Sequence, residues 1–174
     1  DEHAVAEATT KTLAAHGKVD ILVNNAGITG GNMPSWEIPV AQWRRVVDVN
    51  LNAPFIVASA VVPHLIANGW GRVVNIASVH GLVASGNKAP YVASKFGIVG
   101  LSKVAALEYA ASGSRDSGGI TVNCICPGWV ETALIEPQIE ARRNGGSRDD
   151  GVRALIRAEH PRGLTVVRDY DASI

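Results

Sequence analysis

The sequence has few cysteines and few aromatic residues. Only two of its 174 residues are cysteine, Cys124 and Cys126, and aromatic residues make up 5%. We expect these two cysteines to face opposite sides of a strand, so that neither a disulfide nor a CxxC-type metal site forms. We therefore expect no bound metal, and a reducing compartment fits such cysteine usage.

Excess charge and long apolar runs are also lacking. Sixteen Lys and Arg residues balance sixteen Asp and Glu residues, so the chain offers no positive surface that would favour nucleic acid or an anionic membrane. No run of eighteen or more apolar residues occurs, and the first residues, DEHAVAEATT, are acidic where a signal peptide would be basic. We expect a cytoplasmic protein that binds neither nucleic acid nor membranes.

What the sequence does contain is an alternation of apolar runs and helical patterns. Its length and 47% hydrophobic content suit one globular domain. Three apolar runs predict buried strands, at residues 19–24, 72–77 and 120–125. Helical patterns fill residues 2–15, 40–68, 89–111, 130–143 and 149–159; we expect Pro54 and Pro63 to bend or divide the second of these.

This alternation predicts an α/β fold, a doubly wound parallel sheet with helices on its faces. In such a fold, functional residues gather at the carboxyl ends of the strands. The last two helical patterns are placed to form a lid over that edge. The polar stretch 111–119, ASGSRDSGG, indicates a surface loop.

Four residues carry the chemistry that the sequence suggests. Tyr91 and Lys95 are four residues apart in YVASK, so a helix places them on one face. A nearby ammonium favours phenolate and lowers the pKa of a tyrosine toward that of a general acid or base. Ser78 follows a strand thirteen residues before Tyr91, where its hydroxyl can bind the same substrate oxygen. Asn50 lies within a helical pattern, where asparagine is unfavourable.

Each of these residues also has an ordinary structural interpretation. A YxxxK pair arises by chance in many chains, and Asn50 can be a solvated helix residue. The glycines at positions 27, 30 and 31 can form a flexible turn as easily as a phosphate-binding loop.

Five segments taken together resemble the short-chain dehydrogenase/reductase family. They are NNAG (24–27), Asn50, Ser78, YVASK (91–95) and PGWVET (127–132), in the family's order and spacing. The resemblance implies a Rossmann-like fold, a nicotinamide cofactor and a catalytic tetrad of Asn50, Ser78, Tyr91 and Lys95. Tyr91 is then the acid/base, Ser78 polarises the substrate oxygen, Lys95 lowers the tyrosine pKa and binds the nicotinamide ribose, and Asn50 holds a proton-relay water. The residues implied to bind the cofactor are Asn25, Ala26, Gly27, Tyr91, Lys95, Pro127, Gly128, Val130 and Thr132.

Within that family, the substrate positions resemble those of members that oxidise D-3-hydroxybutyrate to acetoacetate with NAD. The residues implied to bind substrate are Ser78, His80, Lys88, Tyr91, Trp129 and Gln138. His80, Lys88 and Gln138 can donate hydrogen bonds to a carboxylate, and Trp129 can cover a methyl group. Each of these four side chains could instead be an ordinary loop, surface or core residue. Thr29 stands where these members place a glutamine.

The resemblance covers about residues 20–159, and two expected features are missing. We find no strand followed by a glycine-rich turn, so we expect a single partial Rossmann-like domain, truncated at its N-terminus and at its C-terminus. The residue that selects NAD or NADP would lie in the missing part, so NADP stays open. Alternatives are a 3-oxoacyl thioester reductase or a catalytically silent truncated homologue kept for oligomerisation. The family resemblance also implies a homotetramer or homodimer.

Overall fold

A computed structural model describes residues 1–112, 118–130 and 135–159, and three parallel strands form its only sheet among these residues. The strands are β1 (Ile21–Asn24), β2 (Gly71–Ile76) and β3 (Ile120–Ile125), in the order β1-β2-β3. Asn24 pairs with Asn75, and Asn75 pairs with Cys124. Since the strands are parallel, their carboxyl ends meet at one edge. The predicted α/β, Rossmann-like fold is confirmed.

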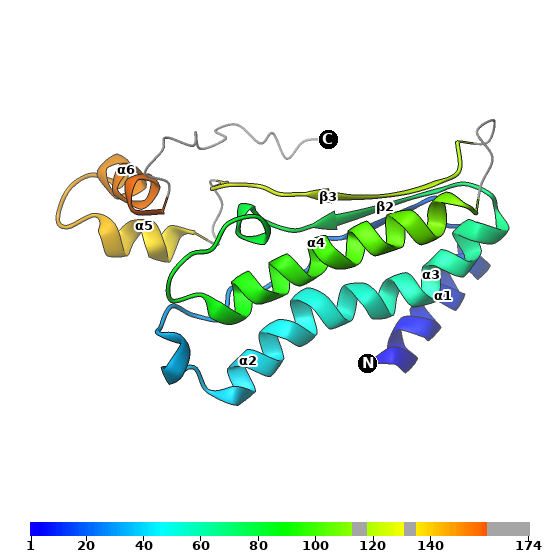
Figure 1. Ribbon diagram of the computed structural model, residues 1–174, viewed down its shortest axis with the longest axis horizontal. Coiled ribbons are helices and arrows are strands. Elements are labelled where there is room, and N and C mark those ends of the chain that lie inside the picture. Colours follow the sequence, from blue (N-terminus) through cyan, green and yellow to red (C-terminus); the bar gives the residue numbers. More distant parts are fainter. Residues whose placement is uncertain (113–117, 131–134, 160–174) are drawn as a thin grey trace. The chain divides into compact units, whose positions relative to one another are not determined.

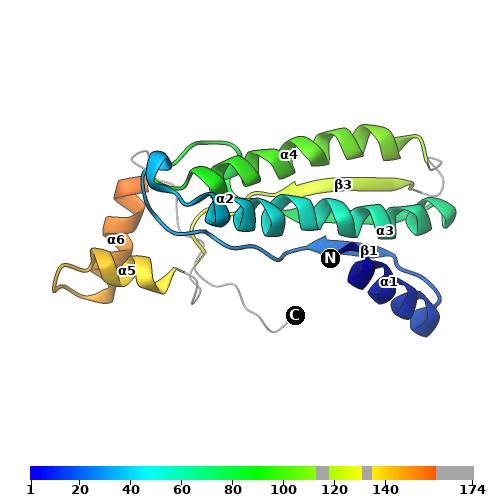
Figure 2. The same ribbon diagram turned by 90° about the horizontal axis from the view of Figure 1, so that it is seen from below.

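The helices of the first unit pack over one face of this sheet (Figures 1 and 2). α3 (Ala53–Ala67) and α4 (Ala89–Ala110) contact the strands, and α1 (Glu2–His16) packs against α3. The core joins α3 and α4 to β2 and β3, and consists of Val61, Val62, Leu65, Val73, Ala105, Ile120 and Val122. Burying these apolar side chains is the main favourable contribution to folding.

The opposite face of the sheet is exposed within the part of the chain that the structure describes. Side chains alternate across a strand, so Leu22 turns to the core while its neighbours Ile21 and Val23 are 56% and 54% exposed. Ile125 on β3 is also exposed. This face is therefore an apolar surface.

The long helical pattern at 40–68 is one helix with a wider turn inside it. It comprises α2 (Val40–Val47), a π-helical segment η2 (Asp48–Asn52) and α3. We expected Pro54 and Pro63 to bend or divide this pattern; they do not divide it, since helix continues through both. The irregularity instead precedes Pro54, which has no N–H to donate and is tolerated in the first turn of α3.

This helix, Val40–Ala67, is long and apolar enough to cross a membrane by length and composition alone. Its apolar character has another explanation, because α3 supplies Val61, Val62 and Leu65 to the core on the sheet. The core helix of a soluble protein passes the same test.

The two cysteines are free, as expected. Our expectation that they face opposite sides of the strand is wrong, because residues two apart share a face. Both pack against the small cluster of Ala77, Ile98 and Val99.

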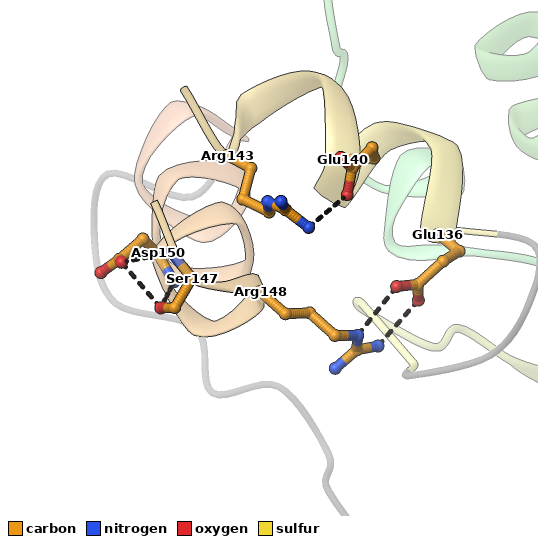
Figure 3. Close-up of polar contacts among 6 residues, drawn as sticks. All are labelled: Glu136, Glu140, Arg143, Ser147, Arg148 and Asp150. Atoms are coloured by element: carbon orange, nitrogen blue, oxygen red, sulfur yellow. Dashed lines mark hydrogen bonds and ion pairs between the residues drawn. The ribbon is translucent and has the colours of Figure 1, made fainter. Parts of the chain in front are cut away.

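The chain divides into two compact units, Asp1–Cys126 and Pro127–Ile174. The second contains α5 (Glu136–Arg142), which is shorter than the helix predicted at 130–143, and α6 (Arg148–Glu159), which agrees with the prediction to within one residue. Figure 3 shows their polar contacts: Arg148 binds the Glu136 carboxylate through Nε and Nη2, both at 2.8 Å. Ser147 and Asp150 cap α6, with the Ser147 N–H donating to the Asp150 carboxylate at 2.9 Å and the Asp150 N–H to the Ser147 hydroxyl at 3.2 Å.

Candidate active site

Tyr91 and Lys95 lie in the first two turns of α4, which begins with Ala89 and Pro90. Proline suits this position because the first N–H groups of a helix have no intrahelical acceptor. The Lys95 Nζ atom lies 5.6 Å from the centre of the Tyr91 ring and donates a 2.8 Å hydrogen bond to the Ile76 carbonyl at the end of β2. This bond holds the ammonium at the carboxyl edge of the sheet, beside the phenol.

Ser78 comes two residues after β2 and meets Tyr91 from the other side. Its side chain is hydrogen-bonded to the Tyr91 side chain. The Ser78 Oγ atom also accepts the His80 N–H at 3.1 Å, which caps the short helix η3 (Val79–Gly81). Because this cap fixes the serine at 8% exposure, its hydroxyl is positioned rather than freely rotating.

The pKa values of Tyr91 and Lys95 differ from the ordinary values of these side chains. Burial raises the pKa of Tyr91 above its ordinary value, while the hydrogen bond with Ser78 acts to lower it. Burial also lowers the pKa of Lys95. The pKa of Tyr91 is raised because desolvation of the phenolate outweighs the hydrogen bond with Ser78. The lowering effect expected of Lys95 stays a prediction.

Asn50 is buried in the π-helical segment and clamps the loop after β1. Its Oδ1 atom accepts the Ile28 N–H at 2.9 Å, and its Nδ2 atom donates to the Ile28 carbonyl at 2.9 Å and to the Ser94 hydroxyl at 3.1 Å. The interpretation of Asn50 as a solvated helix residue is wrong, since it is 2% exposed. It connects the loop to α4 one residue before Lys95.

The segment Asn25 to Gly27 is exposed at the carboxyl end of β1. A Cβ atom added to Gly27 would lie 3.5 Å from the Asn50 Oδ1 atom and 3.6 Å from the Lys95 Nζ atom. The backbone here thus borders the polar side chains of the site. An exposed main chain beside an ammonium and an amide oxygen fits the polar sugar and amide groups of a dinucleotide.

Two of the predicted substrate residues lie in the same unit. The His80 ring packs edge-on against the Tyr91 ring, with 6.1 Å between their centres. Lys88 directly precedes α4 and is 7% exposed. The alternative that Lys88 is a solvated loop lysine is therefore wrong.

The remaining predicted residues belong to the second unit. Trp129 packs against the cluster of Ile135, Ile139, Val152 and Leu155. Gln138 lies half-buried on α5, while Pro127, Gly128 and Val130 follow β3. Their contacts with substrate and cofactor stay predictions, and Thr132 lies outside the described residues.

Comparisons with known proteins agree with this geometry. The family model described as "short chain dehydrogenase" matches residues 1–143. The chain belongs to the short-chain dehydrogenase family. It is 42% identical over 160 residues to a D-beta-hydroxybutyrate dehydrogenase of Rhizobium meliloti, covering 91% of this chain and 59% of that protein.

Other members of the short-chain dehydrogenase family are as similar. A 2-dehydro-3-deoxy-L-rhamnonate dehydrogenase (NAD(+)) of a Sphingomonas species is 42% identical over 136 residues, with 78% of this chain and 52% of that protein covered. The crystal structure of an NAD+-bound xylitol dehydrogenase matches with a TM-score of 0.78 and 31% identity, over 90% of this chain and 60% of that one. The chain thus spans about 59% of the length of the first curated relative.

Reasoning from the sequence missed a second set of polar residues in this short-chain dehydrogenase. Asn75, Ser94 and Ser102 are each at most 4% exposed, but none of them was among the predicted site residues. Asn75 stands alone among apolar residues in RVVNIA. A polar residue inside a buried strand needs a partner, and that was the available signal.

Proposed function

We propose that the protein containing this chain is an NAD-dependent dehydrogenase that oxidises D-3-hydroxybutyrate to acetoacetate. The observation that carries the proposal is the convergence of Ser78, Tyr91 and Lys95 at the carboxyl edge of the sheet, with His80 beside the tyrosine. Such a group suits proton transfer to and from a secondary alcohol.

The residues of the chain would handle the proton, and a bound nicotinamide dinucleotide would supply the hydride acceptor. In oxidation, the substrate hydroxyl gives its proton to the Tyr91 phenolate while Ser78 hydrogen-bonds the same oxygen. The Lys95 ammonium stabilises the phenolate. The Gly27 main chain, Tyr91 and Lys95 would hold the nicotinamide ribose side of the cofactor.

Carboxylate chemistry supports the choice of substrate. Two of the relatives at 42% identity are named for hydroxybutyrate and rhamnonate, both carboxylates. Lys88 offers an ammonium and His80 an imidazole close to Tyr91 along the chain, and a charge-assisted hydrogen bond from lysine suits a carboxylate. NAD is favoured because the relative named for rhamnonate and the xylitol dehydrogenase both carry NAD in their descriptions.

A steady-state assay with matched substrates tests the proposal. Oxidation of D-3-hydroxybutyrate is compared with that of its methyl ester, which keeps the alcohol and removes the charge. Tyr91→Phe should lower kcat by about 10²- to 10⁴-fold, because it removes the proton acceptor. Lys88→Met should raise KM for the acid by roughly 10- to 100-fold and leave KM for the ester unchanged.

Lys11→Met is the control, since Lys11 lies exposed on α1 and pairs only with Glu7 four residues away. A clear preference for acyl thioesters would remove the hydroxy-acid assignment. Retention of most activity by Tyr91→Phe would remove the acid/base assignment.

We also propose that the protein works as a homodimer or homotetramer. α3 and α4 lie side by side over the sheet (Figures 1 and 2) and carry exposed apolar side chains at Phe55, Phe96, Val104 and Leu107. Exposed apolar patches of this kind mark protein interfaces.

A further inference from the structure

A row of polar side chains crosses the sheet beneath α4; Asn75 in this row is buried, and Asn24 and Cys124 are partly buried. Asn24, Asn75 and Cys124 occupy the same register position on β1, β2 and β3. The Asn24 Nδ2 atom donates to the Asn75 Oδ1 atom at 2.8 Å, and the Asn75 Nδ2 atom donates to the Ser102 hydroxyl at 2.7 Å. Ser102 lies on α4, so the row ties two strands to the catalytic helix.

Ser102 is the centre of this row, and its own bonding fixes the direction of every hydrogen bond in it. The Ser102 hydroxyl donates to the Ile98 carbonyl at 2.7 Å. A serine hydroxyl has one donor and two acceptor positions, and the acceptor positions are taken by Asn75 and by the Cys124 thiol at 3.0 Å. All three hydrogen-bonding positions of the Ser102 hydroxyl are therefore filled. Asn75 and Cys124 donate to Ser102 on α4, while Asn24 donates to Asn75 on β2. The Cys124 thiol also lies 3.8 Å from the Ile98 carbonyl oxygen.

The row lies directly beside the residues proposed to act in the reaction. Asn75 precedes Ile76, whose carbonyl accepts the Lys95 ammonium. Asn24 precedes the exposed segment Asn25 to Gly27. Ser102 lies seven residues beyond Lys95 on α4. A shift of α4 along β2 at Ser102 therefore also shifts Lys95 and Tyr91 along the sheet.

We propose that Ser102 and Asn75 are positioning residues, whose hydrogen bond fixes the position of α4 along β2. This position places Tyr91 against Ser78 and Lys95 against the Ile76 carbonyl. This rests on the proposed function, since it concerns the same site. Neither residue touches the reacting atoms; both act through α4. A saturated network of buried hydrogen bonds holds one geometry better than apolar packing of the same volume, because any slip leaves donors unpaired.

The test uses substitutions at Ser102 in the full-length protein. Ser102→Ala removes the acceptor of Asn75 and Cys124, and should lower kcat by about 10- to 100-fold while KM for NAD changes by less than about threefold. Ser102→Thr keeps the hydroxyl and its bond to the carbonyl four residues back, and should restore kcat. Thr10→Ala is the matched control, since the Thr10 hydroxyl makes the same type of bond, to Ala6, on the exposed helix α1.

A measurement without turnover separates this proposal from the proposed function. Ultraviolet titration, with the Tyr91→Phe protein as the subtraction, reports the pKa of Tyr91. Lys95 and His80 are the titratable groups in ring contact with it. Ser102→Ala should raise this pKa, because the Ser78 hydrogen bond that lowers it is weakened; Thr10→Ala should not.

The outcomes are distinct. A wild-type protein that oxidises no alcohol overturns the proposed function, and the titration still decides the positioning role. If Ser102→Ala lowers thermal stability while kcat and the Tyr91 pKa stay at wild-type values, the positioning role is wrong. If Ser102→Ala does not fold, Ser102→Cys replaces it: its weaker acceptor should give a lower kcat than Ser102→Thr, and equal values overturn the proposal.

Discussion

At the scale of single residues, two opposing effects act on the pKa of Tyr91. Burial raises it because the phenolate loses hydration, and the hydrogen bond with Ser78 lowers it because the serine hydroxyl stabilises the phenolate. Because burial is the larger effect, the pKa of Tyr91 is raised, and the phenolate that accepts a proton in oxidation becomes more abundant as pH rises. Oxidation of an alcohol should accelerate as pH rises toward the tyrosine pKa.

Ser78→Ala should raise the pKa of Tyr91 further, since it removes the lowering effect and leaves the desolvation. Ultraviolet titration against the Tyr91→Phe protein measures this. Ser59→Ala is the control, because the exposed Ser59 hydroxyl donates to the Phe55 carbonyl on α3, away from Tyr91 in the sequence. An unchanged or lowered Tyr91 pKa in Ser78→Ala would mean that the serine does not stabilise the phenolate.

The same shift affects stability at high pH. The folded-state pKa of Tyr91 lies above the ordinary tyrosine value of 10.0, so the native state holds this proton more tightly than the unfolded chain. The resulting stabilisation is complete below about pH 10 and is lost as pH rises through the folded-state pKa.

At the scale of elements, the π-helical segment η2 joins the loop after β1 to α4 through the Asn50 side chain. Asn50→Ala should lower the free energy of unfolding by about 1–3 kcal/mol, because it leaves the partly buried Ile28 amide and carbonyl groups without their partner. Asn52→Ala, in the same segment, removes only an exposed bond to Asp48 and should change stability by less than about 0.5 kcal/mol. Urea unfolding measures both free energies of unfolding, and equal values for the two variants would show that the bonds between Asn50 and Ile28 do not stabilise the protein.

The contact between η3 and α4 allows no side chain at Gly81. A Cβ atom there would lie 2.7 Å from the Lys95 carbonyl oxygen and 2.9 Å from Val99 Cγ2. Gly81→Ala should therefore push η3 away from α4, separate Ser78 from Tyr91, and destabilise the protein by about 1–3 kcal/mol. Gly86→Ala is the control, since nothing lies within 4 Å of its Cβ position. Wild-type stability and kcat in Gly81→Ala would show that η3 can move away from α4 without affecting the contact between Ser78 and Tyr91.

The elements themselves could be predicted from the sequence where periodicity is strong. Residues 120–125 form the strand that was predicted, and α4 ends within one residue of its expected end. The turn at residues 48–52 could not be predicted, because π-helical hydrogen bonding depends on tertiary contacts of Asn50 and not on local propensity. For the same reason, Ser102 gave no signal: its role comes from Asn75, 27 residues away.

At the scale of the whole molecule, two apolar surfaces lie on the first unit. One is the open face of the sheet, with Ile21, Val23 and Ile125 each more than half exposed. The other is the outer face of α3 and α4. Both expose side chains that water solvates poorly, and both are suited to be covered by protein.

The outer face of α3 and α4 leads to a prediction about assembly. Leu107 is 80% exposed and lies three residues beyond Val104, which is 52% exposed, on the same side of α4. Light scattering of the full-length protein at micromolar concentration should show a dimer or tetramer. Leu107→Glu should shift it to smaller species, because association would bury an unpaired carboxylate. Leu82→Glu is the matched control, since Leu82 is 57% exposed outside this face. A wild-type monomer, or equal dissociation by both variants, would show that this face is not the interface.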